Sequence, residues 1–153
     1  MVDTFIDAGT QVIWQTGSGQ HEHIRKQLGE RRVGWVGPFI DNMELAYAAA
    51  DVVVCRAGAT TIAEITRGGK AAILVPYPFA AEDHQNHNAK SLAHAGAAEV
   101  IHDADLQLQL EPVLMNLVNN KALRESMAAS SKRLSRPHAG RLIAEYLLHL
   151  ASQ

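Results

Sequence analysis

The segment "DVVVCRAGATTIAE", residues 51–64, decides the fold that the sequence predicts. Its run of β-branched residues ends at Cys55, and Arg56, Ala57 and Gly58 separate that run from a segment that suits a helix. An unbroken apolar run of this length indicates a central strand that is covered on both faces of a parallel sheet. Because Gly58 is expected to let the backbone turn sharply, the segment predicts a strand, a tight turn and a helix.

Short segments of similar β-rich composition recur along the chain, at residues 11–16, 32–36, 71–77 and 97–101. The segments between them suit helices, and strands that alternate with helices form parallel sheets with crossover helices on both faces. Glycines stand where these helices need a left-handed stop, at Gly9, Gly29, Gly68–Gly69 and Gly96. The predicted fold is therefore α/β, a doubly wound, Rossmann-like parallel sheet.

After Leu106 only amphipathic patterns occur, with breaks near Asn119 and at Pro137, which predicts two or three closing helices. The first residues, "DTFIDAG", have the pattern of the second half of a helix, whereas parallel α/β domains usually open on a strand. We therefore expect that a strand and a loop precede this segment in a longer protein, and that residues 1–153 form one incomplete domain.

Composition restricts the function classes. The 153 residues carry 14 Lys and Arg against 16 Asp and Glu, so the net charge of -2 gives no footprint for nucleic acid. The single cysteine, Cys55, indicates a small core residue in a reducing compartment, which predicts the cytoplasm. No apolar stretch reaches the roughly 18 residues that span a bilayer, and the start lacks the pattern of a signal peptide.

The turn at Gly58 is the strongest candidate site, because ligands of open parallel sheets bind beyond the carboxyl ends of the strands. Ala59, Thr60 and Thr61 offer small side chains and unpaired amides at the positive end of a helix, which favours an anion. Glu64 has two interpretations. Its spacing from Thr61 fits a capping box, and its two oxygens equally suit a pair of sugar hydroxyls.

Three other loops are candidates for ligand contact. Residues 16–20, "TGSGQ", form either a phosphate-binding loop or a tight turn. Residues 76–89 place a dense polar cluster from Glu82 to Asn88 where a helix begins; it suits sugar hydroxyls or a capped, solvated first turn with Asp83 as the cap. His84 and His87 share a helix face, but without an HExxH motif or a cysteine pair we predict no metal site.

The fourth loop, residues 37–43, is apolar at Phe39 and Ile40. It suits a slot for a flat ring, in which backbone groups of Ile40 pair with a base edge. Alternatively, these residues form a hydrophobic staple against a helix that begins near Asn42.

The stretches "FIDNMELAYAAADVVVCRAGATTIAEI", residues 39–65, and "GKAAILVPYPFAAEDHQNHNAKSLAHAGAAEVI", residues 69–101, together resemble the carboxyl-terminal half of the MurG family. These glycosyltransferases transfer N-acetylglucosamine from UDP-N-acetylglucosamine to undecaprenyl-pyrophosphoryl-N-acetylmuramoyl-pentapeptide in peptidoglycan synthesis. The resemblance covers about residues 5 to 150 and implies the donor-binding half of a GT-B enzyme.

The resemblance implies a role for each matching position. Ile40 would pair with uracil through its backbone, and Met43 would line the same slot. Glu64 would hold the two ribose hydroxyls, and Gln85 would bind hydroxyls of N-acetylglucosamine, with Asn88 nearby. The donor-facing helix start would comprise the segment Ala59, Thr60, Thr61, Ile62 and Ala63, of which Ala59 to Thr61 would meet phosphate and sugar.

Two departures from the family limit this expectation. The family's "GGS" phosphate loop and the whole amino-terminal domain, with its general base, lipid-acceptor site and membrane-facing patch, do not occur in the sequence. The resemblance therefore implies no catalytic residue in this chain, an isolated chain that is catalytically silent, and membrane contact only through the other domain, at the cytoplasmic face of the plasma membrane.

The family reaction would be a single inverting displacement by the acceptor's C4 hydroxyl. Helix-end amides would stabilise the leaving UDP, with no cofactor and no strict need for a metal. Two alternatives remain open. The chain could be the donor-binding half of another UDP-sugar transferase, such as a glycolipid synthase or a split two-chain enzyme, or it could be a non-catalytic nucleotide-binding module.

Overall fold

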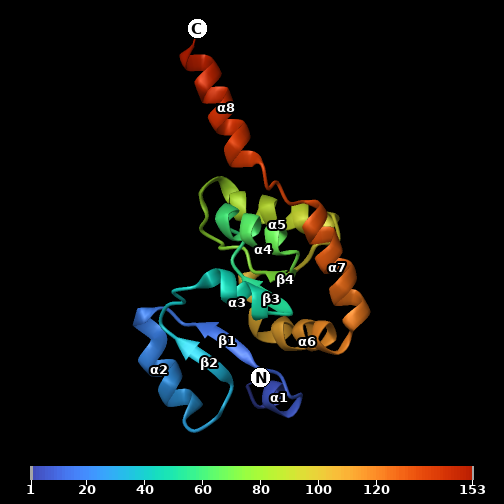
Figure 1. Ribbon diagram of the computed structural model, residues 1–153. Helices are drawn as coiled ribbons and strands as arrows, with labels where there is room; N and C mark the ends of the chain where they lie inside the picture. Colours follow the sequence, from blue (N-terminus) through green and yellow to red (C-terminus); the bar gives the residue numbers. More distant parts are fainter. Residues whose placement is uncertain (1, 153) are drawn as a thin grey trace. The chain divides into compact units, whose positions relative to one another are not determined.

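The computed structural model describes residues 2–152 and divides into two compact units, residues 1–50 and residues 51–153. The first unit contains α1 (Val2–Asp7), β1 (Val12–Gln15), α2 (Ser18–Leu28), β2 (Gly34–Gly37) and α3 (Met43–Ala49) (Figure 1). Its strands β1 and β2 pair in parallel. At Gly34 an added Cβ would lie 2.5 Å from the Val12 carbonyl oxygen, and φ is +113°, so only glycine lets the strands approach there.

The second unit holds the remaining strands, β3 (Val52–Cys55), β4 (Ala71–Leu74) and β5 (Ala98–Val100), in one parallel sheet with β4 in the centre. Its helices are α4 (Ala59–Gly68), α5 (His84–His94), α6 (Leu106–Asn119), α7 (Lys121–Arg133) and α8 (Ala139–Ala151). Two short 3-10 turns, η1 (Ala81–Asp83) and η2 (Asp103–Asp105), precede α5 and α6. Figure 1 shows α4 and α5 on one side of β3 and β4, and α6 on the other.

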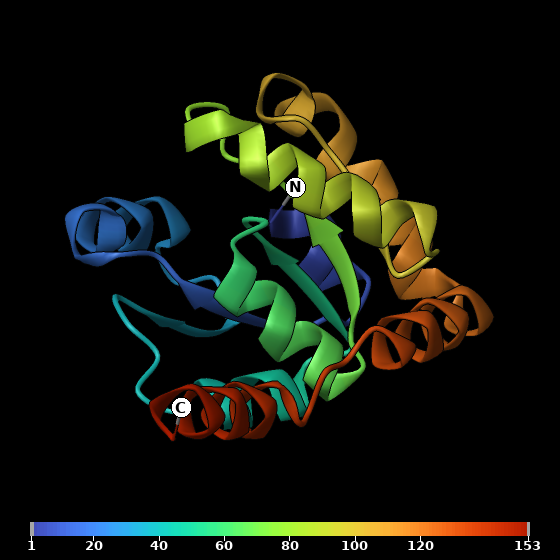
Figure 2. The same cartoon turned by 90° about the horizontal axis from the view of Figure 1, so that it is seen from above.

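The core of the second unit is built around β4, whose four residues are all buried. Ala71 and Ile73 belong to one cluster with Leu117 from α6 and Met127 from α7. Because side chains alternate along a strand, Ala72 and Leu74 point to the opposite face, on which α4 and α5 lie. In the view from above, β3 and β4 are seen between α4 and α5 (Figure 2).

The α/β prediction is confirmed, with all five predicted strands present and parallel. Three helices follow Leu106, with breaks at Asn120 and before Ala139, as expected. Gly9, Gly29, Gly69 and Gly96 all have positive φ at the predicted stops. The prediction that residues 1–153 form one incomplete donor-binding domain stays a prediction, because the two units are described separately.

One detail of the sheet was wrong. Residues 51–55 were expected to form a strand covered on both faces, but β3 is an edge strand of its three-stranded sheet, and Val54 is 42% exposed. Only β4 has a neighbour on each side and is covered throughout. Residues 52–55 and residues 71–74 are both unbroken apolar runs, but only the second run forms a strand that is covered on both faces. Within residues 2–152, no helix is long and apolar enough to cross a membrane.

Candidate functional site

The turn between β3 and α4 lies at the carboxyl end of the second unit's sheet. Gly58 is the N-cap of α4, with φ −70° and ψ 147°, which any residue adopts. The turn therefore does not use a backbone conformation that glycine alone allows. The first helical bond runs from the Ile62 amide to the Gly58 carbonyl at 2.9 Å, so the amides of Ala59 to Thr61 have no acceptor within the helix.

Glu64 does not form the capping box that its spacing from Thr61 allowed. A capping box needs the threonine at the N-cap and the glutamate at the third helical position. Because the N-cap is Gly58, Thr61 takes the third position and Glu64 lies in the second turn. The helix start at Gly58 therefore contradicts the capping-box interpretation of Glu64. The Glu64 side chain is exposed, and its contact with a ligand stays a prediction.

Cys55, the last residue of β3, is influenced electrostatically by Glu64. Burial of the thiol, and secondly the negative charge of Glu64, raise the pKa of Cys55 from 9.0 to about 12. Glu64 lies in α4, the helix that follows β3 along the chain, and the start of this helix carries the amides of Ala59 to Thr61.

We expect Cys55 to react with iodoacetamide far more slowly in the folded chain than in urea at about pH 8, because only the thiolate is nucleophilic. Mass spectrometry of the alkylated chain measures the rates, and equal rates in both states would contradict the burial of the thiol.

The raised pKa of Cys55 also links folding to pH. Because the folded state retains the thiol proton to higher pH, the contribution of Cys55 to stability is complete below pH 9.0 and is lost as the pH rises toward about 12.

The loop between β4 and α5 brings Gln85 and Asn88 to the same edge. The Tyr77 amide donates to Gln85 Oε1 at 3.0 Å, which fixes the amide orientation and directs Nε2 elsewhere. Asn88 Nδ2 donates to the Ala57 carbonyl at 3.1 Å, so α5 holds the turn that leads into α4. In this structure Asn88 thus stabilises the turn before α4.

The turn before α5 has an unusual backbone. Glu82 and Asp83 have φ values of 50° and 55°, a conformation that non-glycine residues rarely adopt. Asp83 stands at the N-cap, as one interpretation expected, but it makes no cap bond to the backbone; its carboxylate accepts from Asn86 Nδ2 instead. The simple capped first turn is therefore not what forms. Among residues 2–152, no three His, Cys, Asp or Glu side chains gather as metal ligands.

Ile40 and Met43 belong to the first unit, apart from the other predicted site residues. The Ile40 amide donates to Gln15 Oε1 at 3.0 Å, and Met43 is the first residue of α3. Asn42 caps α3 by accepting from the Leu45 amide at 3.1 Å, so the staple position is Asp41. Phe39 is 64% exposed, and the hydrophobic staple proposed for residues 39–40 was therefore wrong.

The glycine-rich turn at residues 16–20 is ordered by Thr16, whose hydroxyl lies 3.2 Å from the Gly37 carbonyl oxygen and 3.3 Å from His21 Nδ1. Gly17 has a φ of 74° and forms the N-cap of α2. Both the tight turn and the phosphate-binding loop are compatible with this geometry.

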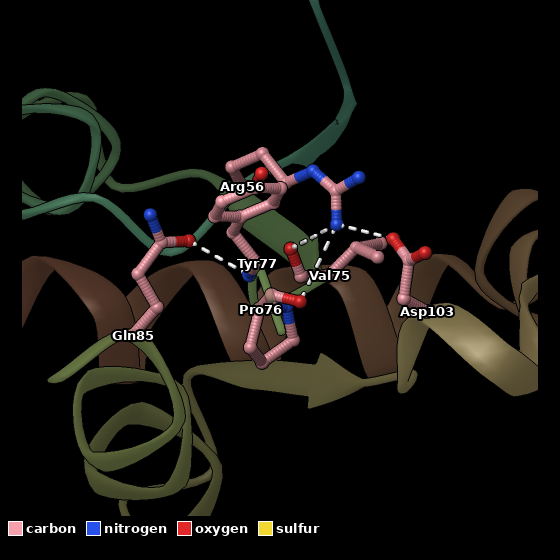
Figure 3. A network of polar contacts seen from close by, with 6 residues as sticks. All are labelled: Arg56, Val75, Pro76, Tyr77, Gln85 and Asp103. Carbon is pink, nitrogen blue, oxygen red and sulfur yellow. Dashed lines mark hydrogen bonds and ion pairs between the residues drawn. The ribbon is translucent and has the colours of Figure 1, made fainter. Parts of the chain in front are cut away.

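The sequence reasoning missed Arg56 and Asp103. Arg56 follows β3 and Asp103 follows β5, and they form an ion pair of 2.5 Å at the site's edge (Figure 3). Opposite charges just beyond two strands of one parallel sheet were the available signal, because those strand ends meet at one edge.

Comparison with known proteins agrees with this architecture. Residues 3–142 match the family model described as the glycosyltransferase family 28 C-terminal domain. A Prosthecochloris aestuarii protein named UDP-N-acetylglucosamine–N-acetylmuramyl-(pentapeptide) pyrophosphoryl-undecaprenol N-acetylglucosamine transferase is 44% identical over 142 residues, 92% of this chain and 39% of the relative. A protein of the same name from Nitratidesulfovibrio vulgaris is 43% identical over 147 residues, 94% of this chain and 40% of the relative.

The crystal structure of Acinetobacter baumannii MurG superposes with a TM-score of 0.80 at 31% identity. The match covers 93% of this chain and 43% of that one. The chain thus spans 39–40% of the length of the two relatives described. The resemblance to the carboxyl-terminal half of the MurG family is confirmed, and the chain belongs to glycosyltransferase family 28 as a C-terminal domain of that family.

Proposed function

We propose that this chain is the donor-binding part of an inverting glycosyltransferase. The enzyme would transfer N-acetylglucosamine from UDP-N-acetylglucosamine to undecaprenyl-pyrophosphoryl-N-acetylmuramoyl-pentapeptide, completing the lipid-linked precursor of peptidoglycan. The names of the relatives support the reaction. The observation that carries the proposal is the start of α4, where unpaired amides and the exposed Glu64 carboxylate occupy one helix at the carboxyl edge of the sheet.

The diphosphate would bind at the amides of Ala59, Thr60 and Thr61. Backbone amides at a helix start point outward, and the helix dipole adds positive potential, so the site suits an anion without a metal. Ile62 and Ala63 continue this turn, with Ala63 exposed beside the proposed ligand. Glu64, in the next turn, would accept hydrogen bonds from the two ribose hydroxyls, because a carboxylate has two acceptor oxygens.

The sugar would lie beside α5. Gln85 Oε1 accepts a hydrogen bond from the Tyr77 amide, so the Gln85 Nε2 group would donate to a hydroxyl oxygen of N-acetylglucosamine. Asn88 would act indirectly, because its hydrogen bond to the Ala57 carbonyl stabilises the turn that leads into α4. In the first unit, Ile40 and Met43 would receive uracil, and the base would either displace Gln15 from the Ile40 amide or use the Ile40 carbonyl.

The reaction would be a direct displacement at the anomeric carbon. The C4 oxygen of the acceptor forms the new bond to that carbon, the bond to the diphosphate oxygen breaks, and the hydroxyl proton passes to a base. UDP gains negative charge as it leaves, so the amides at the start of α4 would help most in the transition state. We place the base, the lipid acceptor and the membrane contact on an amino-terminal domain of the longer protein, at the cytoplasmic face of the plasma membrane.

Isothermal titration of the 153-residue chain with UDP-N-acetylglucosamine, UDP-glucose, UDP and uridine tests the proposal. We expect UDP to bind more tightly than uridine, and UDP-N-acetylglucosamine more tightly than UDP-glucose. Equal affinity for the two sugar nucleotides would favour another UDP-sugar transferase. No binding of any uridine nucleotide would favour a non-catalytic module and would refute the proposal.

Gln85→Ala is expected to lower affinity for UDP-N-acetylglucosamine by roughly 2- to 12-fold, the value of about one neutral hydrogen bond, and to leave UDP affinity unchanged. Titration of both nucleotides measures the difference. Gln109→Ala, an exposed glutamine on α6, serves as the control and should affect neither. An equal loss for both nucleotides would show that Gln85 does not face the sugar.

A further inference from the structure

The side chain of Arg56 connects three segments at the carboxyl edge of the sheet (Figure 3). Its Nη1 donates to Asp103 Oδ1 at 2.5 Å and lies 3.3 Å and 3.4 Å from the carbonyl oxygens of Pro76 and Val75. Arg56 follows β3, Val75 and Pro76 follow β4, and Asp103 follows β5. One guanidinium nitrogen therefore joins the ends of all three strands.

The turn that leads into α4 is held from a second direction as well. Ala57 is completely buried, and its carbonyl accepts from Asn88 Nδ2 at 3.1 Å. Gly58, the N-cap, has no side chain with which to fix the helix start. The position of the Ala59 to Thr61 amides thus depends on the two residues before the cap, Arg56 through its side chain and Ala57 through its carbonyl.

Arg56 also reaches the residue that orients Gln85. Its guanidinium carbon lies 5.6 Å from the centre of the Tyr77 ring, within the range of a cation–π contact. The amide of Tyr77 donates to Gln85 Oε1. Figure 3 shows this chain of contacts running from Asp103 through Arg56 and Tyr77 to Gln85.

We propose that Arg56 and Asp103 are a positioning pair that holds the first amides of α4 for the diphosphate and, through Tyr77, holds Gln85 for the sugar. The inference rests on the proposed function for the identity of the ligand, but the ordering of the turn is a property of the free chain. Asp103 keeps the guanidinium across the strand ends, where it can contact two carbonyls and the ring. Neither residue is assigned to the reacting atoms.

The sign of one effect separates this role from direct phosphate binding by Arg56. The Arg56 and Asp103 side chains are 47% and 41% exposed, so the guanidinium is accessible to an anion. If Arg56 bound phosphate directly, removal of Asp103 would free its charge, and UDP affinity would rise or stay constant. If the pair positions the turn, removal of Asp103 lowers UDP affinity.

The first measurement is ¹⁵N relaxation of the nucleotide-free chain carrying Asp103→Ala. We expect the backbone order parameters of residues 57–61 to fall from about 0.85, the rigid value, toward about 0.6. Asp105→Ala removes a carboxylate from the same short turn but keeps the pair of Arg56 with Asp103, so the order parameters of residues 57–61 should stay unchanged. Unchanged order parameters in Asp103→Ala would overturn the inference.

The second measurement is calorimetric titration with UDP and UDP-N-acetylglucosamine. Asp103→Ala is expected to weaken UDP binding by roughly 2- to 30-fold at unchanged stoichiometry, as residues that act through a network do. Asp103→Asn, which keeps an acceptor for Arg56, should recover part of this loss. A lower stoichiometry with unchanged affinity would indicate partial unfolding and would contradict positioning, as would tighter binding. If the unaltered chain binds no UDP, the proposed function fails, and the relaxation data alone decide whether the pair orders the turn.

Discussion

Glu64→Ala is expected to weaken UDP binding by at least roughly 10- to 150-fold, because Glu64 would accept hydrogen bonds from the ribose and each bond to a charged group contributes about 1.5 to 3 kcal/mol. Uridine binding should weaken by the same factor, since uridine carries the same ribose. Glu64→Gln keeps one acceptor oxygen and loses the charge, so its affinity for UDP should lie between the affinities of the unaltered chain and of Glu64→Ala. Calorimetric titration of the three chains with both ligands measures these ratios.

Thermal unfolding supplies the control for Glu64. Because Glu64 is exposed and lies in the second turn of α4, its removal should barely change the melting temperature. Glu125→Ala removes a comparable exposed carboxylate, paired with Lys121 at 3.6 Å on α7, and should change neither affinity nor melting temperature appreciably. A large drop in melting temperature with normal UDP affinity would show that Glu64 serves the fold.

Local signals were sufficient to predict the elements of the fold. Apolar runs located the strands, glycines located the helix ends, and Asn42 located the start of α3. The strand predicted over residues 71–77 ends at Leu74 in the structure. Val75 still donates to the Cys55 carbonyl at 2.8 Å, but Pro76 has no amide with which to continue the ladder.

The candidate site was only partly predictable, because its contacts join distant segments. Threonine is a common N-cap, which favoured a helix start at Thr61, yet α4 begins at Ala59 because Gly58 already accepts the first helical bond. The pairing of Arg56 with Asp103 spans 47 residues of sequence and exists only once β3 and β5 flank β4. The opposite charges after the two strands were an available signal, but the sequence alone does not show that these two residues pair.

The tertiary core gives the largest expected effect on stability. Leu117→Ala should lower the free energy of unfolding by about 2 to 5 kcal/mol, because Leu117 is completely buried against Ala71, Ile73 and Met127. This loss is a large share of the about 5 to 15 kcal/mol that usually stabilises a domain. Urea unfolding followed by far-UV circular dichroism measures it. Both tryptophans, Trp14 and Trp35, lie in the first unit, so their fluorescence would not report this core.

UDP affinity should distinguish an effect on this core from an effect on the proposed ligand site. The cluster around Leu117 includes Val52 and Ala71, the first residues of β3 and β4, whereas the proposed ligand lies beyond the other end of these strands. The folded fraction of Leu117→Ala should therefore bind UDP with normal affinity. Leu108→Ala, on the same helix but 81% exposed, should change stability by no more than about 0.5 kcal/mol. If Leu117→Ala weakened UDP binding at urea concentrations where the chain is still folded, the core and the helix start of α4 would be coupled, and the two ends of the sheet would not act independently.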